Sequence, residues 1–173
     1  LNPDISGVME DKETDNGIEI TRINISDDTA AQKMGKARGK YITMDAPDLV
    51  NRMPDMFART SQRLAKEISA LAGDAIHQAP TLVVGLGNRF VTPDALGPRV
   101  VDKIYVTRHI TQDMPNLLQK KLQEVSAIAP GVLGVTGVET AEVVRGVVKS
   151  VQPALIIASD SLASRRSARI STT

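Results

Sequence analysis

The sequence TLVVGL at residues 81–86 decides the fold, because it is a short apolar run without the alternation of a half-exposed strand. Such a run is typical of a strand that is buried on both faces of a parallel sheet. Two similar runs follow, VSAIA at residues 125–129 and ALIIA at residues 154–158, and helical patterns at residues 100–110 and 140–150 separate the three. This order of strands and helices predicts an α/β fold with a mainly parallel sheet flanked by helices.

The first half of the chain follows a different pattern. Residues 17–25 alternate between polar and apolar side chains, which predicts a half-buried strand, and a second strand is expected at residues 40–44. Between them, Ser26-Asp27-Asp28 is a candidate cap for a short helix that ends at Gly35. Residues 53–72 predict a long amphipathic helix. Its large apolar side chains lie on or near one face: Met56, Phe57, Leu64, Ile68 and Leu71.

Residues 1–16 are polar, acidic and without a period, so we expect a flexible lead-in. A chain of 173 residues fits one compact domain. We therefore expect residues 17–173 to form a single α/β domain that carries a small N-terminal α+β extension. The chain begins at Leu1 rather than Met, which is compatible with a processed N-terminus.

The composition argues against several classes of function. Hydrophobic residues make up 42% of the chain but aromatic residues only 2%, so we expect an aliphatic core and no base-stacking surface. The net charge of +1 favours neither nucleic acid nor an anionic membrane as a partner. The absence of cysteine excludes disulfides, thiol nucleophiles and cysteine-ligated metals. No apolar run reaches the roughly 20 residues of a membrane span and no signal peptide opens the chain, so we expect a cytoplasmic protein.

Two carboxylates stand where the predicted parallel strands end. Asp160 follows residues 154–158 almost directly, and Asp94 follows residues 81–86 after a polar connection. Ligands of parallel α/β sheets bind beyond the carboxyl ends of the strands. A single acid in a first helical turn or after a strand is explained by structure alone, since it complements the helix dipole or forms a turn. Two such acids at one edge can divide the roles of general acid and general base, so Asp94 and Asp160 are the candidate catalytic pair.

The connection that leads to Asp94 allows two interpretations. Gly97-Pro98 can begin a helix, which would leave residues 87–97 as a long loop over the strand ends. Alternatively, Thr92 caps a helix with Pro93 in its first turn, which would place Asp94 at a helix N-terminus. The sequence GLGN at residues 85–88 lacks the third glycine of a dinucleotide-binding loop, so a tight turn is favoured there.

Other polar or glycine-rich positions near the strand ends have both a structural and a functional interpretation. Residues 130–137 form a glycine-rich loop that could cradle an anion or a peptide backbone, or simply turn tightly. Glu139 is either a first-turn helix acid or a site carboxylate. His109 lies near the end of a helical pattern, where the helix dipole favours a cation. A Ser-His-Asp triad would need this histidine, but no Gly-x-Ser-x-Gly elbow is present.

Five segments together resemble the germination protease (spore endopeptidase) family. They are VGLGNR at residues 84–89, VTPDALGP at 91–98, VTRH at 106–109, APGV at 129–132 and LASR at 162–165. The upstream stretch GKYIT at residues 39–43 is similar too. The resemblance therefore covers nearly the whole chain.

The resemblance implies an endopeptidase that degrades small acid-soluble spore proteins during germination, in the cytoplasm of the developing spore or the spore core. It also implies a homotetramer, made as a zymogen with an N-terminal propeptide, and a relation to hydrogenase-maturation endopeptidases, which have a parallel-sheet α/β sandwich. The family's catalytic aspartates correspond to Asp94 and Asp160. The residues expected to bind substrate or support the site are Asn88, His109, Gly131, Glu139 and Arg165. We expect no metal and no other cofactor.

Three departures from the family pattern bear on these expectations. The sequence SDSLASR at residues 159–165 stands where the family usually has IDALASR, and both changes flank Asp160. No propeptide is recognisable before Leu1, and family members continue far beyond Thr173, so we expect an incomplete substrate cleft. Two other functions stay open: a metal-assisted peptidase that uses Asp94, Asp160 and His109, and a non-catalytic ligand-binding fragment.

Overall fold

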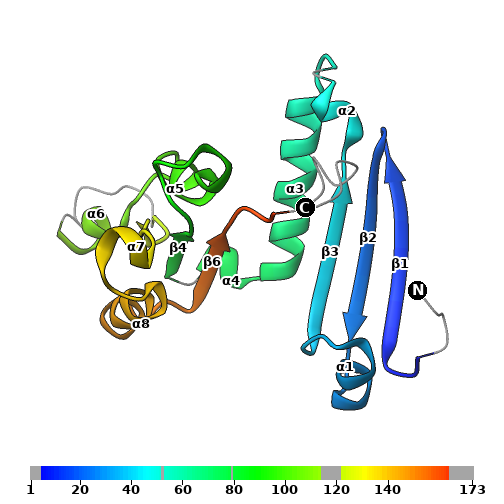
Figure 1. The fold of residues 1–173 in the computed structure, drawn as a ribbon, viewed down its shortest axis with the longest axis horizontal. Helices are drawn as coiled ribbons and strands as arrows, with labels where there is room; N and C mark the ends of the chain where they lie inside the picture. The colour runs from blue at the N-terminus through cyan, green and yellow to red at the C-terminus, as the bar shows by residue number, and fades with distance from the viewer. Residues whose placement is uncertain (1–4, 52, 79, 114–121, 164–173) are drawn as a thin grey trace. The chain divides into compact units, whose positions relative to one another are not determined.

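An antiparallel sheet and a parallel sheet, which share no strand, organise the chain (Figure 1). The computed structural model describes residues 5–51, 53–78, 80–113 and 122–163. These residues form two compact units, the first up to Leu71 and the second from Ala72 to Ala163. We expected one domain from residue 17 onward, whereas the structure divides this stretch, because each sheet has its own ladder of backbone hydrogen bonds.

The first unit is built on the sheet β1-β2-β3, formed by β1 (Val8–Asp15), β2 (Ile18–Ile25) and β3 (Gly39–Asp45). A two-residue turn joins β1 to β2, and its residues Asn16 and Gly17 both have positive φ (50° and 83°). Asn-Gly is the preferred pair for such a hairpin. Residues 8–15 therefore do not form the flexible lead-in that we expected. They pair with β2 along their whole length, because the turn places a partner strand beside them.

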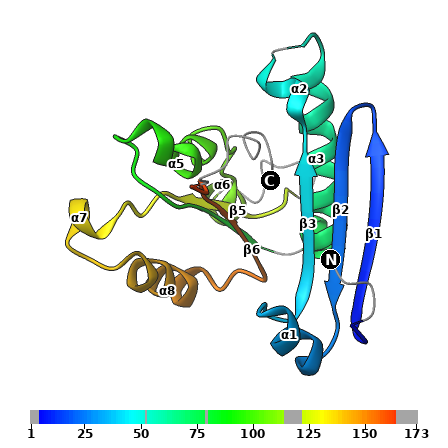
Figure 2. The same ribbon diagram turned by 45° about the vertical axis from the view of Figure 1, so that its right-hand side comes forward.

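Three helices of the described residues belong to this unit: α1 (Asp28–Met34), α2 (Pro47–Val50) and α3 (Met56–Ala72). α1 has the predicted ends, since the Asp27 carboxylate accepts a hydrogen bond from the Ala30 N–H at 2.8 Å and Gly35 closes the helix with a φ of 61°. α3 runs along the sheet (Figures 1 and 2). The apolar core of the unit consists of Ile18, Ile20, Met44, Ala46 and Met56.

A network of ion pairs fixes α3 to the sheet. Arg63 of α3 is only 7% exposed, and its guanidinium donates to Glu13 (2.6 Å) and Asp15 (2.9 Å) of β1. Glu67 of α3 is 5% exposed and accepts from Arg63 (2.9 Å) and from Arg22 of β2 (2.7 Å). A buried charge is costly unless an opposite charge and hydrogen bonds compensate it. The network therefore allows α3 to bury a charged face.

The second unit is built on the parallel sheet of β4 (Thr81–Gly85), β5 (Val125–Ile128) and β6 (Leu155–Ser159), in the order β5-β4-β6. The three apolar runs of the sequence form these three strands. β4 lies at the centre and is buried at every position, as the run without alternation predicted. The α/β character expected from the sequence is thus present in this unit.

Helices α5 (Leu96–Val101) and α8 (Thr140–Val151) lie on opposite faces of the parallel sheet (Figures 1 and 2). The other helices of the unit are α4 (Ala75–Gln78) before β4, α6 (Arg108–Asp113) before β5 and α7 (Leu133–Thr136) after β5. No helix in the described part of the chain is both long enough and apolar enough to cross a membrane.

The single helix predicted for residues 100–110 is wrong, because Thr107 separates α5 from α6. Its N–H donates to the Val125 carbonyl and its hydroxyl accepts from the Val125 N–H, both at 2.9 Å. Its own carbonyl accepts from the N–H groups of Ile110 and Thr111, which starts a new helix. Contact with the start of β5 therefore breaks a pattern that looks continuous in the sequence.

Candidate active site

The carboxyl ends of the three parallel strands define one edge of the second unit. The chain leaves β4 toward β5 on one side and later returns past β4 to form β6 on the other, so the strand order reverses between β4 and β6. Ligands of open α/β sheets bind at such a switch point. Asp160 follows β6 directly and Asp94 follows β4 after a loop. The two candidate acids thus emerge from neighbouring strands on either side of the switch point.

The pairing of β4 and β6 extends to the base of both acids. Gly85 lies opposite Ser159, and the Leu86 N–H donates to the Ser159 carbonyl at 2.8 Å. Gly97 of α5 packs over this point, since a Cβ on Gly97 would lie 2.4 Å from the Leu86 nitrogen and 2.5 Å from the Ser159 oxygen. Only glycine allows so close an approach. The helix that follows Asp94 is therefore held against the strand end from which Asp160 emerges.

The half-buried Asp94 is fixed by its own loop. It ends a 3₁₀ turn, η1 (Thr92–Asp94), and its carboxylate accepts a hydrogen bond from the Asn88 N–H at 2.8 Å. Gly87 has a φ of 111°, and a Cβ there would lie 2.1 Å from the Asp94 carbonyl oxygen and 2.9 Å from its carboxylate. Of the two interpretations of this loop, each holds in part: Pro93 lies in the turn that contains Asp94, and α5 begins two residues before Pro98.

Two further contacts of the Asp94 loop lie on its outer side. The Asn88 side-chain oxygen accepts from the Phe90 N–H at 2.9 Å. Arg89 forms a two-pronged ion pair with Asp102, at the end of α5, through hydrogen bonds of 2.8 and 3.0 Å. These hydrogen bonds raise the pKa of Arg89 and lower the pKa of Asp102, so both groups stay charged at neutral pH. The ion pair ties the loop to the helix that follows it.

Asp160 is supported more lightly than Asp94. Its side chain is exposed, and its carboxylate accepts a hydrogen bond from the Ser161 N–H at 2.8 Å. β6 lies at the edge of the sheet, and its residues Ile156 and Ala158 are exposed. The position of Asp160 therefore depends on the end of β6 and on one local hydrogen bond.

Large apolar side chains are exposed on the segments that follow all three strands. Phe90, Val91 and Leu96 follow β4, Leu133, Val135 and Val138 follow β5, and Leu162 follows β6. Exposed apolar side chains that gather around polar groups are typical of binding sites. We call these seven residues the apolar rim.

Of the other predicted site residues, Asn88, Gly131 and Glu139 lie at the carboxyl edge. Asn88 supports Asp94 through its backbone N–H. Gly131 follows β5, and its carbonyl accepts from the Thr140 hydroxyl at 2.9 Å, which ties the glycine-rich loop to the start of α8. Glu139 is the exposed residue that precedes α8. Both Gly131 and Glu139 follow the strand on the far side of β4 from Asp160.

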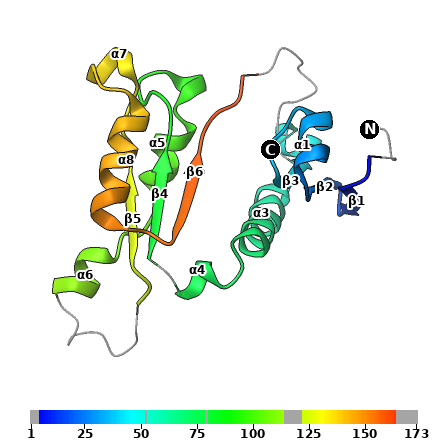
Figure 3. The same cartoon turned by 90° about the horizontal axis from the view of Figure 1, so that it is seen from below.

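His109 is not brought to the two acids. It is exposed on α6, and α6 begins beside Val125 at the amino end of β5. Figure 3 shows α6 and α7 at opposite ends of β5. The break after α5, which the sequence did not reveal, carries His109 to the edge of the sheet opposite Asp94. Arg165, the remaining predicted site residue, lies outside the described residues.

The metal-assisted alternative receives no support from His109, since this residue is far from the carboxyl edge in the fold. Within the described ranges, no group of three or more His, Asp or Glu side chains is placed to hold a metal ion.

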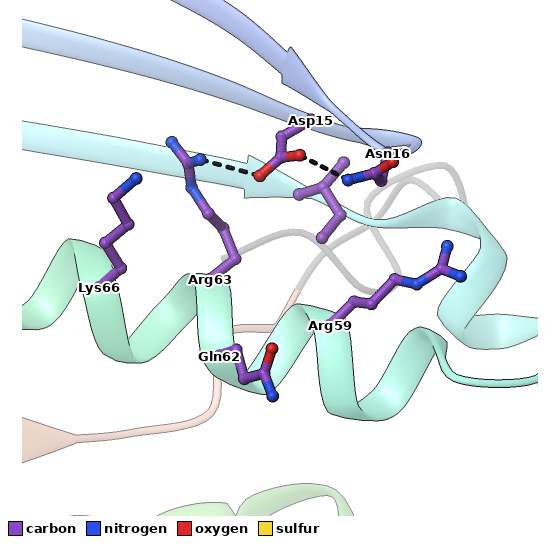
Figure 4. Close-up of a pocket in the computed structure, with 7 residues that line it drawn as sticks. Asp15, Asn16, Arg59, Gln62, Arg63 and Lys66 are labelled. Carbon is purple, nitrogen blue, oxygen red and sulfur yellow. Dashed lines mark hydrogen bonds and ion pairs between the residues drawn. The ribbon is translucent and has the colours of Figure 1, made fainter.

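A cavity of about 210 Å³ lies in the first unit (Figure 4), whereas both candidate acids belong to the second. It is lined by Asp15, Asn16, Ile18, Arg59, Gln62, Arg63 and Lys66. Arg63 is committed to the ion-pair network, whose hydrogen bonds from Arg63 and Arg22 lower the pKa of Glu13 to about 2. The charges around this cavity hold α3 to the sheet, so we do not assign chemistry to it.

The fold defines a class: an α/β protein in which two carboxylates follow neighbouring strands at the switch point of a parallel sheet, the place where such sheets bind ligands. The model of the germination protease family matches residues 2–173 of the chain. The chain belongs to the germination protease family.

Relatives from several bacteria agree with this assignment. The germination protease of Caldanaerobacter subterraneus subsp. tengcongensis is 50% identical over 170 residues, which cover 98% of this chain and 52% of that protein. The germination proteases of Clostridium perfringens and Bacillus cereus are each 39% identical, over 99% and 98% of this chain and 53% and 46% of their own lengths. The chain thus spans about half the length of the curated relatives that it matches.

Proposed function

We propose that this chain carries the catalytic centre of an endopeptidase that degrades small acid-soluble spore proteins during germination. The observation that supports it most is the placement of Asp94 and Asp160, which follow neighbouring parallel strands on either side of the switch point. Family membership supplies the substrate class, since the relatives are named germination proteases.

The two carboxylates would act as an acid–base pair. The ionised aspartate takes a proton from a water molecule, which attacks the peptide carbonyl carbon. The protonated aspartate donates its proton to the carbonyl oxygen or to the leaving nitrogen. The mechanism needs one ionised and one protonated aspartate, and either residue can take either role.

The apolar rim supports a polypeptide as substrate. An extended peptide presents a side chain about every 3.3 Å along its length, so several side chains can contact exposed residues around the scissile bond. Phe90 on the loop after β4 and Leu162 after β6 flank the two acids in sequence. The glycine-rich loop that contains Gly131 would contact the peptide backbone on the β5 side.

Membership of the family also supports the wider proposals. We propose a homotetramer that is made as a zymogen, acts in the cytoplasm of the spore, and is of an atypical aspartic type related to hydrogenase-maturation endopeptidases. These proposals rest on the resemblance of the motifs around Asp94 and Asp160 to those of the family.

Substitution of each acid by its amide tests the catalytic pair. Asp94→Asn and Asp160→Asn should each lower the rate of cleavage of a purified spore protein by about 10²- to 10⁴-fold, because each removes a proton-transfer group. Circular dichroism and thermal unfolding would show that the fold is kept. Asp74→Asn, which changes an exposed acid in the same unit, is the matched control. Full activity of Asp160→Asn would refute the carboxylate-pair mechanism.

A further inference from the structure

The segment that follows β5 forms a loop at the carboxyl edge of the parallel sheet. It runs from Gly131 to Thr140 and contains α7, and we call residues 131–140 the β5 loop. Three residues of the apolar rim lie on it and are exposed to 49%, 57% and 42%: Leu133, Val135 and Val138. Because these side chains stay in water, their burial contributes little to the order of the loop, and other contacts must fix its shape.

One threonine hydroxyl closes the base of the β5 loop. The Thr140 hydroxyl donates to the Gly131 carbonyl at 2.9 Å, so it joins the first residue of the loop to the last. Thr140 is also the first residue of α8, which lies on one face of the parallel sheet (Figure 2). The base of the loop is therefore attached to a helix that packs on the sheet.

A second threonine hydroxyl fixes the tip of the β5 loop. The Thr136 hydroxyl accepts from the Val138 N–H at 3.2 Å and donates to the Val138 carbonyl at 3.0 Å. The Thr136 N–H donates to the Val132 carbonyl at 3.1 Å. A Cβ on Gly131 would lie 3.1 Å from the Thr136 methyl carbon, so the tip is folded back against the base.

The β5 loop lies beside the strand that leads to Asp94. β5 pairs with one side of β4, and β6, which leads to Asp160, pairs with the other. Neighbouring strands are about 4.8 Å apart, and an extended peptide advances about 3.3 Å per residue. A peptide that crosses the strand ends would therefore reach the β5 loop within about two or three residues of the scissile bond.

We propose that Thr136 and Thr140 are positioning residues for the substrate. Their hydroxyls hold the β5 loop in the shape in which its three exposed apolar residues contact the peptide on one side of the scissile bond. A loop that has this shape only part of the time binds more weakly, in proportion to that fraction. The inference rests on the proposed endopeptidase function, and it assigns the two hydroxyls to substrate binding rather than to proton transfer.

Kinetics of spore-protein cleavage by the whole chain test the two hydroxyls. Thr140→Val and Thr136→Val should each raise KM by about three- to tenfold, because the net contribution of one hydrogen bond corresponds to a factor of this size. The kcat should stay that of the wild type. Valine keeps the branched shape of threonine and removes only the hydroxyl. Thr140→Ser keeps the hydroxyl and should therefore restore the KM of the wild type.

Thr111→Val is the matched control. The Thr111 hydroxyl donates to the Arg108 carbonyl at 2.8 Å on α6, so this variant loses a hydrogen bond of the same kind. α6 and α7 lie at opposite ends of β5 (Figure 3). Urea denaturation should show similar losses of stability for Thr111→Val and Thr140→Val, whereas only Thr140→Val should raise KM. Equal KM values for the two variants would show that the Thr140 hydroxyl has a structural role alone.

Binding measured without cleavage separates this inference from the proposed function. The Asp94→Asn variant should bind fluorescently labelled spore protein, and Thr140→Val in that background should weaken binding by about three- to tenfold. Unchanged binding, a lower kcat at unchanged KM, or a Thr140→Ser variant as impaired as Thr140→Val overturns the positioning role. A wild-type chain that binds spore protein without cleaving it refutes the proposed activity, and the ratio of binding constants still decides the role of the β5 loop. A wild-type chain that does not bind spore protein overturns both proposals.

Discussion

Addition of one methyl group at Gly87 should impair catalysis by the second unit more than it impairs the stability of its fold. Its backbone φ of 111° lies in a region that side chains rarely adopt, and a Cβ would lie 2.1 Å from the Asp94 carbonyl oxygen. Ordinary contact begins near 3.4 Å, so Gly87 or the Asp94 segment must move by about 1.3 Å in Gly87→Ala. The Asn88 N–H that holds the Asp94 carboxylate moves with this segment.

The expected effect on catalysis is larger than the effect on stability. A side chain at positive φ costs about 1 to 2 kcal/mol, and the close contact adds to that cost, so we expect a loss of at least about 2 kcal/mol in the free energy of unfolding. Displacement of a catalytic group by about 1 Å can lower the rate by about 100-fold. Gly87→Ala should therefore lower kcat by about two orders of magnitude in protein that is still folded.

Kinetics of spore-protein cleavage and urea denaturation, measured on the same preparations, test this reasoning. Gly146→Ala is the matched control, because a Cβ at Gly146 meets nothing within 4 Å and the residue lies on α8 of the same unit, outside the proposed binding residues. It should keep the activity of the wild type without loss of stability. A Gly87→Ala variant with the kcat of the wild type would show that the position of Asp94 does not control the reaction.

Three further predictions concern charged residues. Arg89→Asp should lower kcat/KM several-fold by freeing the Asp94 loop, and the double variant Arg89→Asp with Asp102→Arg should restore most of it; a double variant no better than the single one would refute the positioning role. Asp94→Glu should cost more activity than Asp160→Glu, because Asp94 packs against Gly87 while Asp160 is exposed, and equal losses would contradict this. The ion pairs of Glu13 lower its pKa from 4.5 to about 2, so they contribute stability that is complete above pH 4.5 and is lost as pH falls toward 2. Acid titration followed by circular dichroism should therefore show that Glu13→Gln loses less stability over this pH range than the wild type.

The parallel sheet could be predicted from the sequence because its signal is local. Five consecutive apolar or β-branched positions in β4 are all buried, and no distant residue is needed to explain them. β1 could not be predicted in this way, because its sequence VMEDKETD has no alternation and only its pairing with β2 makes it a strand. The break between α5 and α6 depends in the same way on Thr107 and Val125, which are 18 residues apart.

The packing of helix α3 could also be predicted only in part from the sequence. Its range and its amphipathic character could be predicted, but the direction of its apolar face could not. Arg63 is neutralised by Glu13 and Asp15, which lie 50 and 48 residues earlier on β1. Because β1 was not predicted, the acids that neutralise Arg63 could not be identified from the sequence. The missed strand and the unpredicted orientation of α3 therefore have a single cause.

The two candidate acids could be identified because they follow apolar runs in the sequence. The groups that hold their side chains in place could not. Asp94 is held by a backbone N–H and by the absence of a side chain at Gly87, and neither has a sequence signature of its own. Asp160 is exposed at the end of an edge strand. Catalytic contacts are often loose in a free enzyme and tighten when substrate binds. In the proposed mechanism Asp94 would thus define the reaction centre in advance. A bound peptide, in contact with the apolar rim, would bring Asp160 to it.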